Sequence, residues 1–312
     1  MIYKNRKKGV ILIEARSITK RYGDFTAIED ITLTVGPSSI YGLAGYNGAG
    51  KTTLIKTLAG IYKPESGGAY IDGQNTFDNN TVRDRLFYVP DELFFLPYAT
   101  MDTMAKFYRG YYPDFSAKRY EKLKKVFELN GSKRLRSFSK GMKRQAEIIF
   151  ALSVKPTVIL LDESFDGLDP QKRSIVKELL LEYIAESEVS ILISSHNLSE
   201  LSDVSDHIGL IKGKALIVDS PTDDISERYR RFCVVFDKEI NADIFENIDR
   251  KGLKIIGKGA QLIASEDLEN IRDSLNQMNP VSVEENTLSL EEIFLFEMED
   301  STYDFSEFFN EE

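Results

Sequence analysis

Short apolar stretches near the start of the chain predict strands. Residues 10–13 are all apolar, residues 28–35 alternate apolar and polar side chains, and residues 40–43 are again mostly apolar. An alternation with period two is typical of a strand with one buried face. Residues 51–59 carry helical spacing instead, and Gly60 follows in the position where a glycine commonly ends a helix. We therefore expect several strands and one helix here.

The middle of the chain is predicted to alternate helices and buried strands. Residues 93–152 have a helical pattern with many aromatic side chains. Residues 158–161 and 189–194 are largely apolar runs, typical of parallel strands covered on both faces. A helical pattern lies between them at 171–186, and a short one follows at 198–203. This β–α–β order predicts a parallel sheet with helices on both sides.

The pattern changes at about residue 221. The remainder is predicted to hold strands and helices in a small α/β unit, at 231–237, 253–256 and 281–284 for strands and 268–277 and 290–298 for helices. The last dozen residues are acidic with scattered Phe and Tyr, as in a tail. We thus expect two domains, 1–220 and 221–312, the second ending in this acidic tail.

Charge supports the same division. The chain has 312 residues and a net charge of −10 from 50 acidic and 40 basic side chains. Residues 221–312 contain 23 acids and 9 bases, a net of −14, which leaves 27 acids and 31 bases, a net of +4, for residues 1–220. The overall sign argues against nucleic acid as the main partner, and the asymmetry indicates two parts with different tasks.

Cysteine content and hydropathy limit the other possibilities. The single cysteine, Cys233, excludes an intrachain disulfide and a metal site built from cysteines, and fits a reducing compartment. No apolar run approaches the roughly 20 residues of a spanning helix or the roughly 7–15 of a secretory leader. If the protein acts at a membrane, we expect it to do so through a partner.

A phosphate-binding loop is predicted at residues 45–52. Their sequence, G-Y-N-G-A-G-K-T, matches G-x-x-x-x-G-K-[ST] between a predicted strand and a predicted helix. Glycines let backbone N–H groups turn towards a phosphate, and the helix N-terminus adds its dipole. Lys51 would neutralise the β- and γ-phosphates and the Thr52 hydroxyl would ligate Mg²⁺. A nucleotide is predicted, and the lack of an N-K-x-D motif disfavours a G protein.

Two acids follow the predicted strand at 158–161, at the sheet edge where ligands of open α/β sheets bind. Asp162 suits the Mg²⁺ shell, and Glu163 suits a general base that activates water for attack on the γ-phosphate. His196 follows the next strand and is suited to a hydrogen bond with the γ-phosphate. A lone histidine is more often structural. The residues by themselves therefore leave two roles open for His196, a γ-phosphate contact and a structural one. His207 is interpreted as structural.

Between the phosphate loop and this acidic pair, residues 138–145 read F-S-K-G-M-K-R-Q. This stretch resembles the signature motif of ABC ATPases, and the S-F-D-G-L-D run at 164–169 fits the same family. The resemblance covers residues 12–220. It implies an ABC-type P-loop fold, in which N-terminal antiparallel strands join the parallel sheet, residues 93–152 form a helical subdomain, and residues 221–312 form a C-terminal accessory α/β domain.

The resemblance also implies roles for particular residues. Tyr22 is similar to the aromatic that stacks on adenine, Glu163 to the catalytic base, and His196 to the switch that contacts the γ-phosphate. The implied ATP contacts are Tyr46, Asn47, Gly48, Ala49, Gly50, Lys51, Thr52 and Thr53. The resemblance further implies that signature residues contact the ATP bound by a second subunit; these are Ser139, Lys140, Gly141 and Met142. Asp166 and Asp169 lie in the loop that meets that subunit.

Four positions depart from the family pattern. Asp91 stands where the loop leading to the helical subdomain usually has glutamine; its carboxylate can still ligate Mg²⁺ but has no amide donor for the attacking water. Lys140 and Met142 replace a glycine and a glutamine of the signature, and Ser164 replaces the proline after the catalytic glutamate. These departures bear on turnover and coupling rather than on ATP binding.

The S-K-G-M signature and the P-D-E loop at 90–92 resemble a bacterial export-type subgroup of ABC ATPases. It is often encoded in GntR-regulated operons and includes bacitracin-resistance and phenol-soluble-modulin exporters. The implied protein is a cytoplasmic ATPase subunit, peripheral at the inner face of the membrane. It would bind a transmembrane permease and a second ATP-binding subunit, as a homo- or heterodimer, to export a peptide, antimicrobial or other amphipathic cargo.

Two other functions stay open from the sequence. One is a regulatory ATP-binding subunit with a slow or degenerate site, as the changes at Asp91, Lys140 and Met142 indicate. The other is a soluble ABC ATPase without a membrane partner. The aromatic residues of 93–115 also have two interpretations, because they can fill the core of the helical subdomain or contact the permease. We expect Phe94, Phe95 or Tyr98 to be among the contacts.

Overall fold

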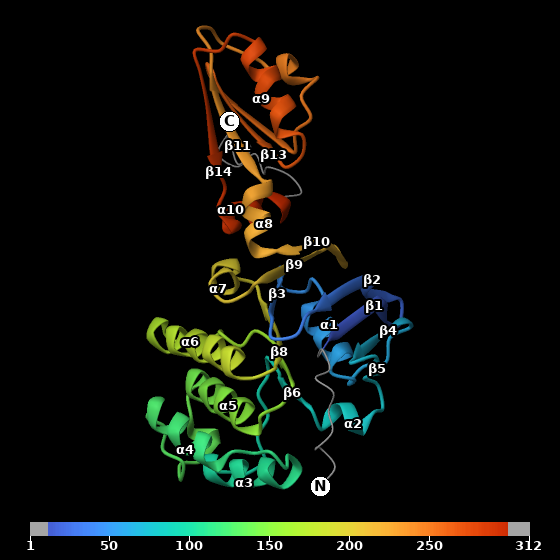
Figure 1. Ribbon diagram of the computed structural model, residues 1–312, viewed down its shortest axis with the longest axis vertical. Helices are drawn as coiled ribbons and strands as arrows, with labels where there is room; N and C mark the ends of the chain where they lie inside the picture. The colour runs from blue at the N-terminus through green and yellow to red at the C-terminus, as the bar shows by residue number, and fades with distance from the viewer. Residues whose placement is uncertain (1–11, 299–312) are drawn as a thin grey trace, which may run out of the picture. The chain divides into compact units, whose positions relative to one another are not determined.

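The computed structural model describes residues 12–298, except for the side chain of Ser226. The chain divides between Ser220 and Pro221 into two compact units, each with its own strands and helices (Figure 1). The acidic tail that the sequence indicates lies outside the described range. Within that range, no helix has both the length and the apolar character that crossing a bilayer requires.

A six-stranded sheet with strand order β10-β9-β3-β8-β7-β6 forms the centre of the first unit. The five strands from β9 to β6 pair in parallel. Strands β3, β7 and β8 are buried along their whole length, as expected when both faces of a sheet are covered. The strands are β3 (Ile40–Ala44), β6 (Leu86–Val89), β7 (Val158–Leu161), β8 (Ser190–Ser195), β9 (His207–Lys212) and β10 (Ala215–Pro221). The predicted parallel α/β fold is confirmed.

A second, antiparallel sheet has the order β2-β1-β4-β5. Its strands are β1 (Ile13–Tyr22), β2 (Phe25–Val35), β4 (Ser66–Ile71) and β5 (Gln74–Asn75). Residues 10 and 11 of the strand expected at 10–13 lie outside the described range, and within that range β1 begins at Ile13 and continues to Tyr22, beyond the predicted end. The register is irregular between Ala15 and Ile18 and interrupts the alternation of buried side chains. The sequence pattern therefore did not indicate this strand.

Apolar side chains of both sheets enclose α1 (Lys51–Leu58), the helix that follows the glycine-rich loop. Leu54, Ile55 and Leu58 of this helix are fully buried in one core with side chains from β1, β3 and β7. The apolar face of α1 therefore fixes where its N-terminus points, which is towards the ends of the parallel strands.

Helices gather on one side of the six-stranded sheet, where α3, α4, α5 and α6 lie together (Figure 1). The helical segments between β4 and the end of the first unit are α2 (Asn80–Arg83), α3 (Met101–Tyr111), α4 (Ala117–Val126), η1 (Leu135–Ser137), α5 (Lys140–Val154), α6 (Pro170–Glu186) and α7 (Leu198–Ser202). Residues 93–100 form no helix, although the sequence pattern placed them in the helical region. A capping box between Thr100 and Thr103 starts α3 at Met101.

The aromatic side chains of residues 93–115 divide between core and surface. The rings of Tyr108 and Tyr112 pack against Phe87, and that of Tyr108 also packs against Phe150. Phe94 and Tyr98, by contrast, are 76% and 79% exposed. The core interpretation is therefore confirmed for Tyr108 and Tyr112, while the contact of Phe94 and Tyr98 with a permease stays a prediction.

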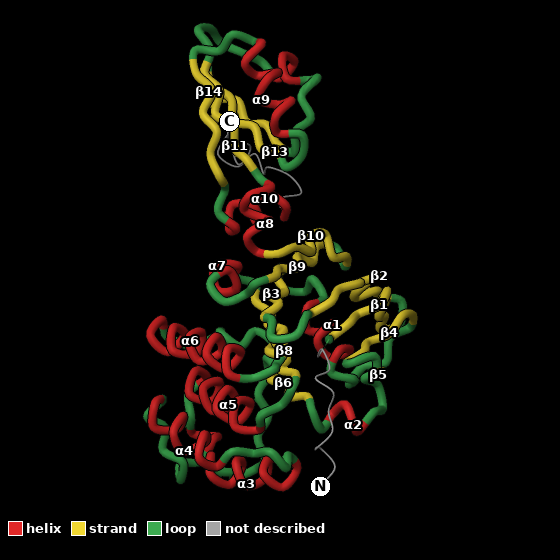
Figure 2. The backbone as a smooth tube through the Cα atoms, viewed as in Figure 1, coloured by secondary structure: helices red, strands yellow, loops and turns green. Residues whose placement is uncertain are grey.

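The second unit is a four-stranded antiparallel sheet, β12-β13-β11-β14, with α9 beside it (Figure 2). Its core includes the fully buried Phe232, Phe245, Leu262 and Leu275. The elements are α8 (Thr222–Arg228), β11 (Arg230–Val235), η2 (Ala242–Phe245), β12 (Gly252–Ile256), β13 (Gly259–Ala264), α9 (Leu268–Gln277), β14 (Ser282–Thr287) and α10 (Leu290–Met298). Strand β13 and helix α8 were not predicted.

We expect the substitution Phe232→Ala to destabilise the second unit alone. Phe232 is fully buried in that unit's own core, and truncating a core phenylalanine costs about 3–5 kcal/mol. Scanning calorimetry should show one unfolding transition at lower temperature and the other unchanged. Cys233→Ala, at the neighbouring half-buried position, should leave both transitions nearly in place. An equal shift of both transitions would contradict separate cores.

Candidate functional site

The glycine-rich loop at 45–52 joins β3 to α1. Gly50 caps the helix in a left-handed conformation with φ of 108°. A Cβ at this position would press against the Ile28 side chain and the Ala27 carbonyl oxygen, so only glycine fits. The first N–H groups of α1 have no partner within the helix, and its dipole favours negative charge at this end. The loop and the helix N-terminus form an anion-binding site.

Lys51 is buried at the start of α1 and its ammonium is held inside the loop. Its Nζ donates to the carbonyl oxygen of Gly45 at 2.6 Å and to that of Tyr46 at 3.2 Å. Its Nζ also lies 3.0 Å from Oε1 of Glu163, which comes from the end of a different strand. The positive charge therefore stands between the phosphate loop and the predicted catalytic carboxylate.

Glu163 and His196 meet because β7 and β8 are parallel neighbours whose carboxyl ends coincide. Leu161 pairs with Ile193, and the polar residues that follow each strand reach the same edge of the sheet. Oε2 of Glu163 accepts from the backbone N–H of His196 at 3.3 Å and lies 2.9 Å from its Nδ1. One carboxylate is thus bound by Lys51 on one oxygen and by His196 on the other.

The backbone at Glu163 is held in an unusual conformation. Its φ is 47°, which costs roughly 1–2 kcal/mol for a residue with a side chain. The Ser194 hydroxyl fixes it, accepting from the N–H of Glu163 at 3.0 Å and donating to Oδ1 of Asp162 at 2.7 Å. Ser194 therefore orients both acids of the predicted pair. The sequence interpretation missed it, although it lies two residues before His196.

The two adjacent acids have opposite pKa shifts. Burial raises the pKa of Asp162, although hydrogen bonds from Ser194 and Thr52 partly offset it. Burial also tends to raise the pKa of Glu163, but the charge of Lys51 and the contact with His196 outweigh it, so its pKa lies below the usual range. Glu163 is therefore a carboxylate at neutral pH, which a proton acceptor must be.

A cleft of about 550 Å³ opens over these residues. The sequence-predicted residues that line it are Tyr22, Tyr46, Asn47, Gly48, Gly50, Lys51, Thr52, Thr53, Asp91, Glu163, Asp166 and His196. Phe25 and Ala27 of β2 also line it and were not predicted. Asp162 lies beneath it, fully buried beside Thr52. Ala49, Asp169 and the signature residues do not line this cleft.

The signature residues stand at the beginning of α5. Ser139 caps this helix, accepting from the N–H of Met142 at 3.2 Å. Gly141 packs so closely on the Gly167 carbonyl oxygen that a Cβ would clash there. Nζ of Lys140 lies 3.6 Å from Oδ2 of Asp166, so this lysine, which replaces a glycine of the family pattern, is tied to the loop after Glu163.

Asp169 ends that loop as the cap of α6, accepting from the N–H of Lys172 at 2.9 Å. This hydrogen bond fixes the loop where it meets the helix. The residue expected at a subunit interface therefore also has a local structural role in its own chain.

Asp91 is held by a residue that the sequence interpretation passed over. Arg144 of α5 is fully buried, and its guanidinium donates to the carbonyl oxygens of Pro90 at 2.6 Å and Asp91 at 3.0 Å. Its Nη2 also lies 3.3 Å from Oδ1 of Asp91. Arg144 contacts only one of the two carboxylate oxygens of Asp91, so the other can bind a ligand in the cleft that Asp91 lines. Arg144 joins the helix that begins at the signature to the loop that enters the cleft.

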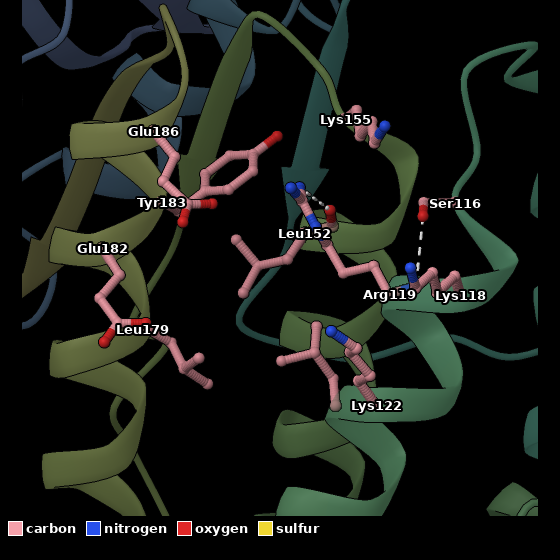
Figure 3. Close-up of a pocket in the computed structure, with 11 residues that line it drawn as sticks. Ser116, Lys118, Arg119, Lys122, Leu152, Lys155, Leu179, Glu182, Tyr183 and Glu186 are labelled. Atoms are coloured by element: carbon pink, nitrogen blue, oxygen red, sulfur yellow. Dashed lines mark hydrogen bonds between the residues drawn. The ribbon is translucent and has the colours of Figure 1, made fainter.

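Two further hollows lie away from the phosphate loop. One, of about 350 Å³, is formed by the stretch from Leu93 to Ala99 together with Arg134, Arg136 and Lys143. The other, of about 430 Å³, lies between α4 and α6, with Lys118 and Lys122 on one side and Glu182 and Glu186 on the other (Figure 3). The second contains none of the predicted site residues.

Comparisons with known proteins agree with this geometry. Residues 28–166 match the family model described as ABC transporter. The chain is 29% identical over 288 residues to the ABC transporter ATP-binding protein YtrB of Bacillus subtilis (strain 168), covering 91% of this chain and 97% of that protein. It is 32% identical over 240 residues to the bacitracin transport ATP-binding protein BcrA of Bacillus licheniformis, covering 71% of this chain and 73% of that protein.

The solved structures give the same result. A structure described as the ATP binding subunit of an ABC transporter superposes with a TM-score of 0.64 at 29% identity, covering 69% of this chain and 92% of that chain. The match to YtrB covers 91% of this chain, so it must include much of residues 221–312. The second unit is therefore shared with at least one relative.

The buried Glu147 of α5, one turn after Lys143, predicts a pH dependence. Burial raises the pKa of its carboxyl from 4.5 to about 8, and nearby Arg144 lowers it only in part. The folded chain therefore binds more protons than the unfolded chain between these values, and stability is lost as pH rises through about 8. Relative to Glu147→Gln, the free energy of unfolding of the wild type should fall from about pH 5 to about pH 8.

Denaturant titrations of both proteins at several pH values would check this expectation. Glu178→Gln, at an exposed position of α6, serves as the matched control and should follow the wild type at every pH. A difference between the wild type and Glu147→Gln that stays constant with pH would show that Glu147 is ionised in the fold.

Proposed function

The chain belongs to the ABC transporter ATP-binding proteins, and from that premise we propose that it is the ATP-hydrolysing subunit of an exporter. The chain would bind a separate transmembrane subunit at the inner face of the cell membrane. Its similarity to the bacitracin transport protein BcrA of Bacillus licheniformis supports a peptide, antimicrobial or other amphipathic cargo. The cargo itself would be bound by the transmembrane partner.

The convergence of Lys51, Glu163 and His196 at the phosphate loop carries the proposal. The phosphates of ATP would lie on the N-terminus of α1, where backbone N–H groups and Lys51 stabilise their charge. Glu163, kept ionised by its neighbours, would take the proton of the attacking water. His196, fixed by its contacts with Glu163, would donate to the γ-phosphate. Tyr22, at the rim of the cleft, would stack on adenine.

Mg²⁺ fits the donors that the site offers. The Thr52 hydroxyl and the Asp162 carboxylate are hydrogen-bonded neighbours, and Asp91 reaches the same cleft. Hard oxygen donors of this kind suit Mg²⁺. We propose that these three residues hold the ion, directly or through water, and that it neutralises the charge of the β- and γ-phosphates.

A second ATP-binding subunit, identical or homologous, would complete the site. Ser139, Lys140, Gly141 and Met142 do not line the cleft of their own chain, and they stand at the N-terminus of a long helix. That position suits contact with a γ-phosphate held by the partner. The loop containing Asp166 and Asp169 packs against the same signature residues and would lie at the interface.

The aromatic groove from Leu93 to Ala99 is the proposed contact for the transmembrane subunit. It presents exposed Phe94, Leu96 and Tyr98 with three cations at Arg134, Arg136 and Lys143. A short amphipathic helix can be recognised by such a surface. The groove follows directly after Asp91 and Glu92, so a helix bound there would act on the loop that enters the cleft.

A regulatory ATP-binding subunit with a slow site is the alternative that particular observations favour. Asp91 is partly engaged by Arg144, and Lys140 replaces a signature glycine. The convergence at Glu163 argues against it. The other alternative, a soluble ABC ATPase with a partner outside the membrane, differs from the proposed exporter subunit only in its partner. Co-purification with an integral membrane protein would support the exporter subunit.

Replacing Glu163 by glutamine should stop hydrolysis without stopping ATP binding. Loss of a general base typically costs about 10²–10⁴-fold in rate, while Lys51 and the loop remain to bind phosphate. We expect ADP formation to fall at least about 100-fold, and size-exclusion chromatography with ATP to show a dimer. Lys51→Ala should form no such dimer. If the wild type, with its membrane partner present, hydrolyses ATP no faster than Glu163→Gln, the regulatory alternative is correct.

Charges in the aromatic groove should uncouple the two subunits. Phe94→Asp or Tyr98→Asp puts a charge on an exposed ring position outside the cleft, so basal ATPase of the isolated chain should be unchanged. Stimulation of ATPase by the co-purified transmembrane subunit in liposomes should be lost. Phe77→Asp, at another exposed aromatic position, should preserve stimulation. Loss of basal activity or of folding in the groove variants would contradict the proposal that the groove contacts the transmembrane subunit.

A further inference from the structure

Two loops flank Glu163, and one ion pair joins them. The first loop, residues 164–169, leads from Glu163 to α6. The second runs from Ser195, at the end of β8, to Asn197 and holds His196. Nη1 of Arg173 in α6 lies 2.9 Å from Oε1 of Glu200 in α7. The same guanidinium donates through Nη2 to the carbonyl oxygen of Leu168 at 3.4 Å. Arg173 therefore contacts the first loop and the helix that follows the second.

Glu200 extends this connection to both sides of His196. Its Oε2 accepts from the Ser195 hydroxyl at 2.8 Å, and the Ser195 oxygen accepts from the N–H of Asn197 at 3.0 Å. Ser195 and Asn197 are the residues immediately before and after His196. His196 in turn contacts Glu163 through both its backbone N–H and its ring. The path thus runs from Leu168 through Arg173 and Glu200 to the loop of His196.

Burial makes this path sensitive to the loss of one member. The Glu200 side chain is only 6% exposed and that of Arg173 is 31% exposed. Each oxygen of the Glu200 carboxylate has a partner, so an amide in its place would leave one acceptor oxygen for the half-buried Arg173 guanidinium and the buried Ser195 hydroxyl. A buried hydroxyl or amide without its hydrogen-bond partner is unfavourable, and the loops would shift to relieve it.

We propose that Arg173 and Glu200 are positioning residues that set His196 in its place and link it to the loop of Asp166 and Asp169. The proposal rests on the proposed function, in which that loop meets the second ATP-binding subunit and His196 contacts the γ-phosphate. Arrival of the second subunit would act on the first loop, and the ion pair would carry that displacement to His196. Hydrolysis would then depend on assembly through this bridge.

A second ion pair between the same helices provides a matched control. Nζ of Lys177 in α6 lies 2.6 Å from Oδ2 of Asp203 at the end of α7. Glu200→Gln and Asp203→Asn both change an acid to its amide, and both remove the partner of a cation on α6. Only Glu200 hydrogen-bonds to the loop of His196. Because Asp203 is 65% exposed and Glu200 only 6%, Asp203→Asn controls for the change from acid to amide, and a readout at His196 itself separates positioning from a merely structural role.

The experiment compares ATP hydrolysis by the full-length wild type, Glu200→Gln, Arg173→Met and Asp203→Asn. Misplacement of a catalytic group by an ångström can cost about 100-fold, so we expect kcat to fall about tenfold or more in Glu200→Gln and Arg173→Met. KM for ATP should change less than about twofold, because the cleft residues are untouched. Asp203→Asn should match the wild type in both. If Asp203→Asn slows equally, or if Glu200→Gln keeps the wild-type kcat, the proposal is wrong.

Histidine NMR gives a readout that does not depend on activity. The chain has two histidines, and His207, bound to Asp219, is an internal reference. Imidazole resonances can be assigned with His207→Gln. Glu200→Gln should shift or broaden the His196 resonance and leave that of His207 unchanged, while Asp203→Asn should change neither. An unperturbed His196 in folded Glu200→Gln would overturn the proposal.

Two controls separate the possible failures. Wild type that hydrolyses no ATP would overturn the proposed function, whereas normal wild type with unaffected bridge variants would overturn only the bridge. Should Arg173→Met not fold, Arg173→Lys keeps the charge but loses one of the two contacts, and it should show a smaller loss of kcat. In a His196→Ala background, Glu200→Gln should cause no further loss of kcat; an additive loss would show that Glu200 does not act through His196.

Discussion

The carboxylate of Glu163 is the group around which the first unit is arranged. Lys51 binds one of its oxygens and His196 the other. Glu163 follows β7, His196 follows β8, and Lys51 begins α1 just beyond β3, and these three strands are adjacent in the parallel sheet. Ser194 fixes the strained backbone of Glu163 and the adjacent Asp162. Because Lys51 and His196 together outweigh the effect of burial on the pKa of Glu163, the carboxylate stays ionised. Sheet register and electrostatics together therefore prepare a proton acceptor beside the phosphate loop.

Two arginines, Arg144 and Arg173, connect the cleft to the surrounding helices. Arg144 joins α5, which begins at the signature residues, to Pro90 and Asp91 at the entrance of the cleft. Arg173 joins α6 to the loop after Glu163 and, through Glu200, to the loop of His196. Each arginine contacts a backbone carbonyl oxygen and a carboxylate at once, because the separate nitrogens of its planar guanidinium can face different acceptors. The loops around the cleft are thereby connected to the surfaces proposed to meet other subunits.

The sequence was sufficient to predict the parts of the site whose residues are contiguous or follow directly after a strand. Residues 45–52 are contiguous, and the polar ends of the two apolar runs at 158–161 and 189–194 must meet once the strands are parallel. Contacts between residues distant in the sequence could not be predicted, because nothing near Arg144 or Arg173 indicates that they reach Asp91 or Glu200. Strand β1 was misplaced because its irregular register hides the alternation, and β13, a short Gly- and Ala-containing strand, has too weak a pattern. Burial of Tyr108 and exposure of Tyr98 depend on packing that periodicity does not contain.

The central claim is that ATP is hydrolysed at Glu163 in a site that a second subunit completes through Ser139 and Gly141. The most direct test is the rate of ATP hydrolysis per chain, with saturating Mg²⁺ and ATP, measured across dilutions of the purified chain and repeated with its co-purified partners. The account predicts a rate per chain that rises with subunit concentration and then levels off. A measurable rate that stays the same from monomeric dilutions upwards would contradict it.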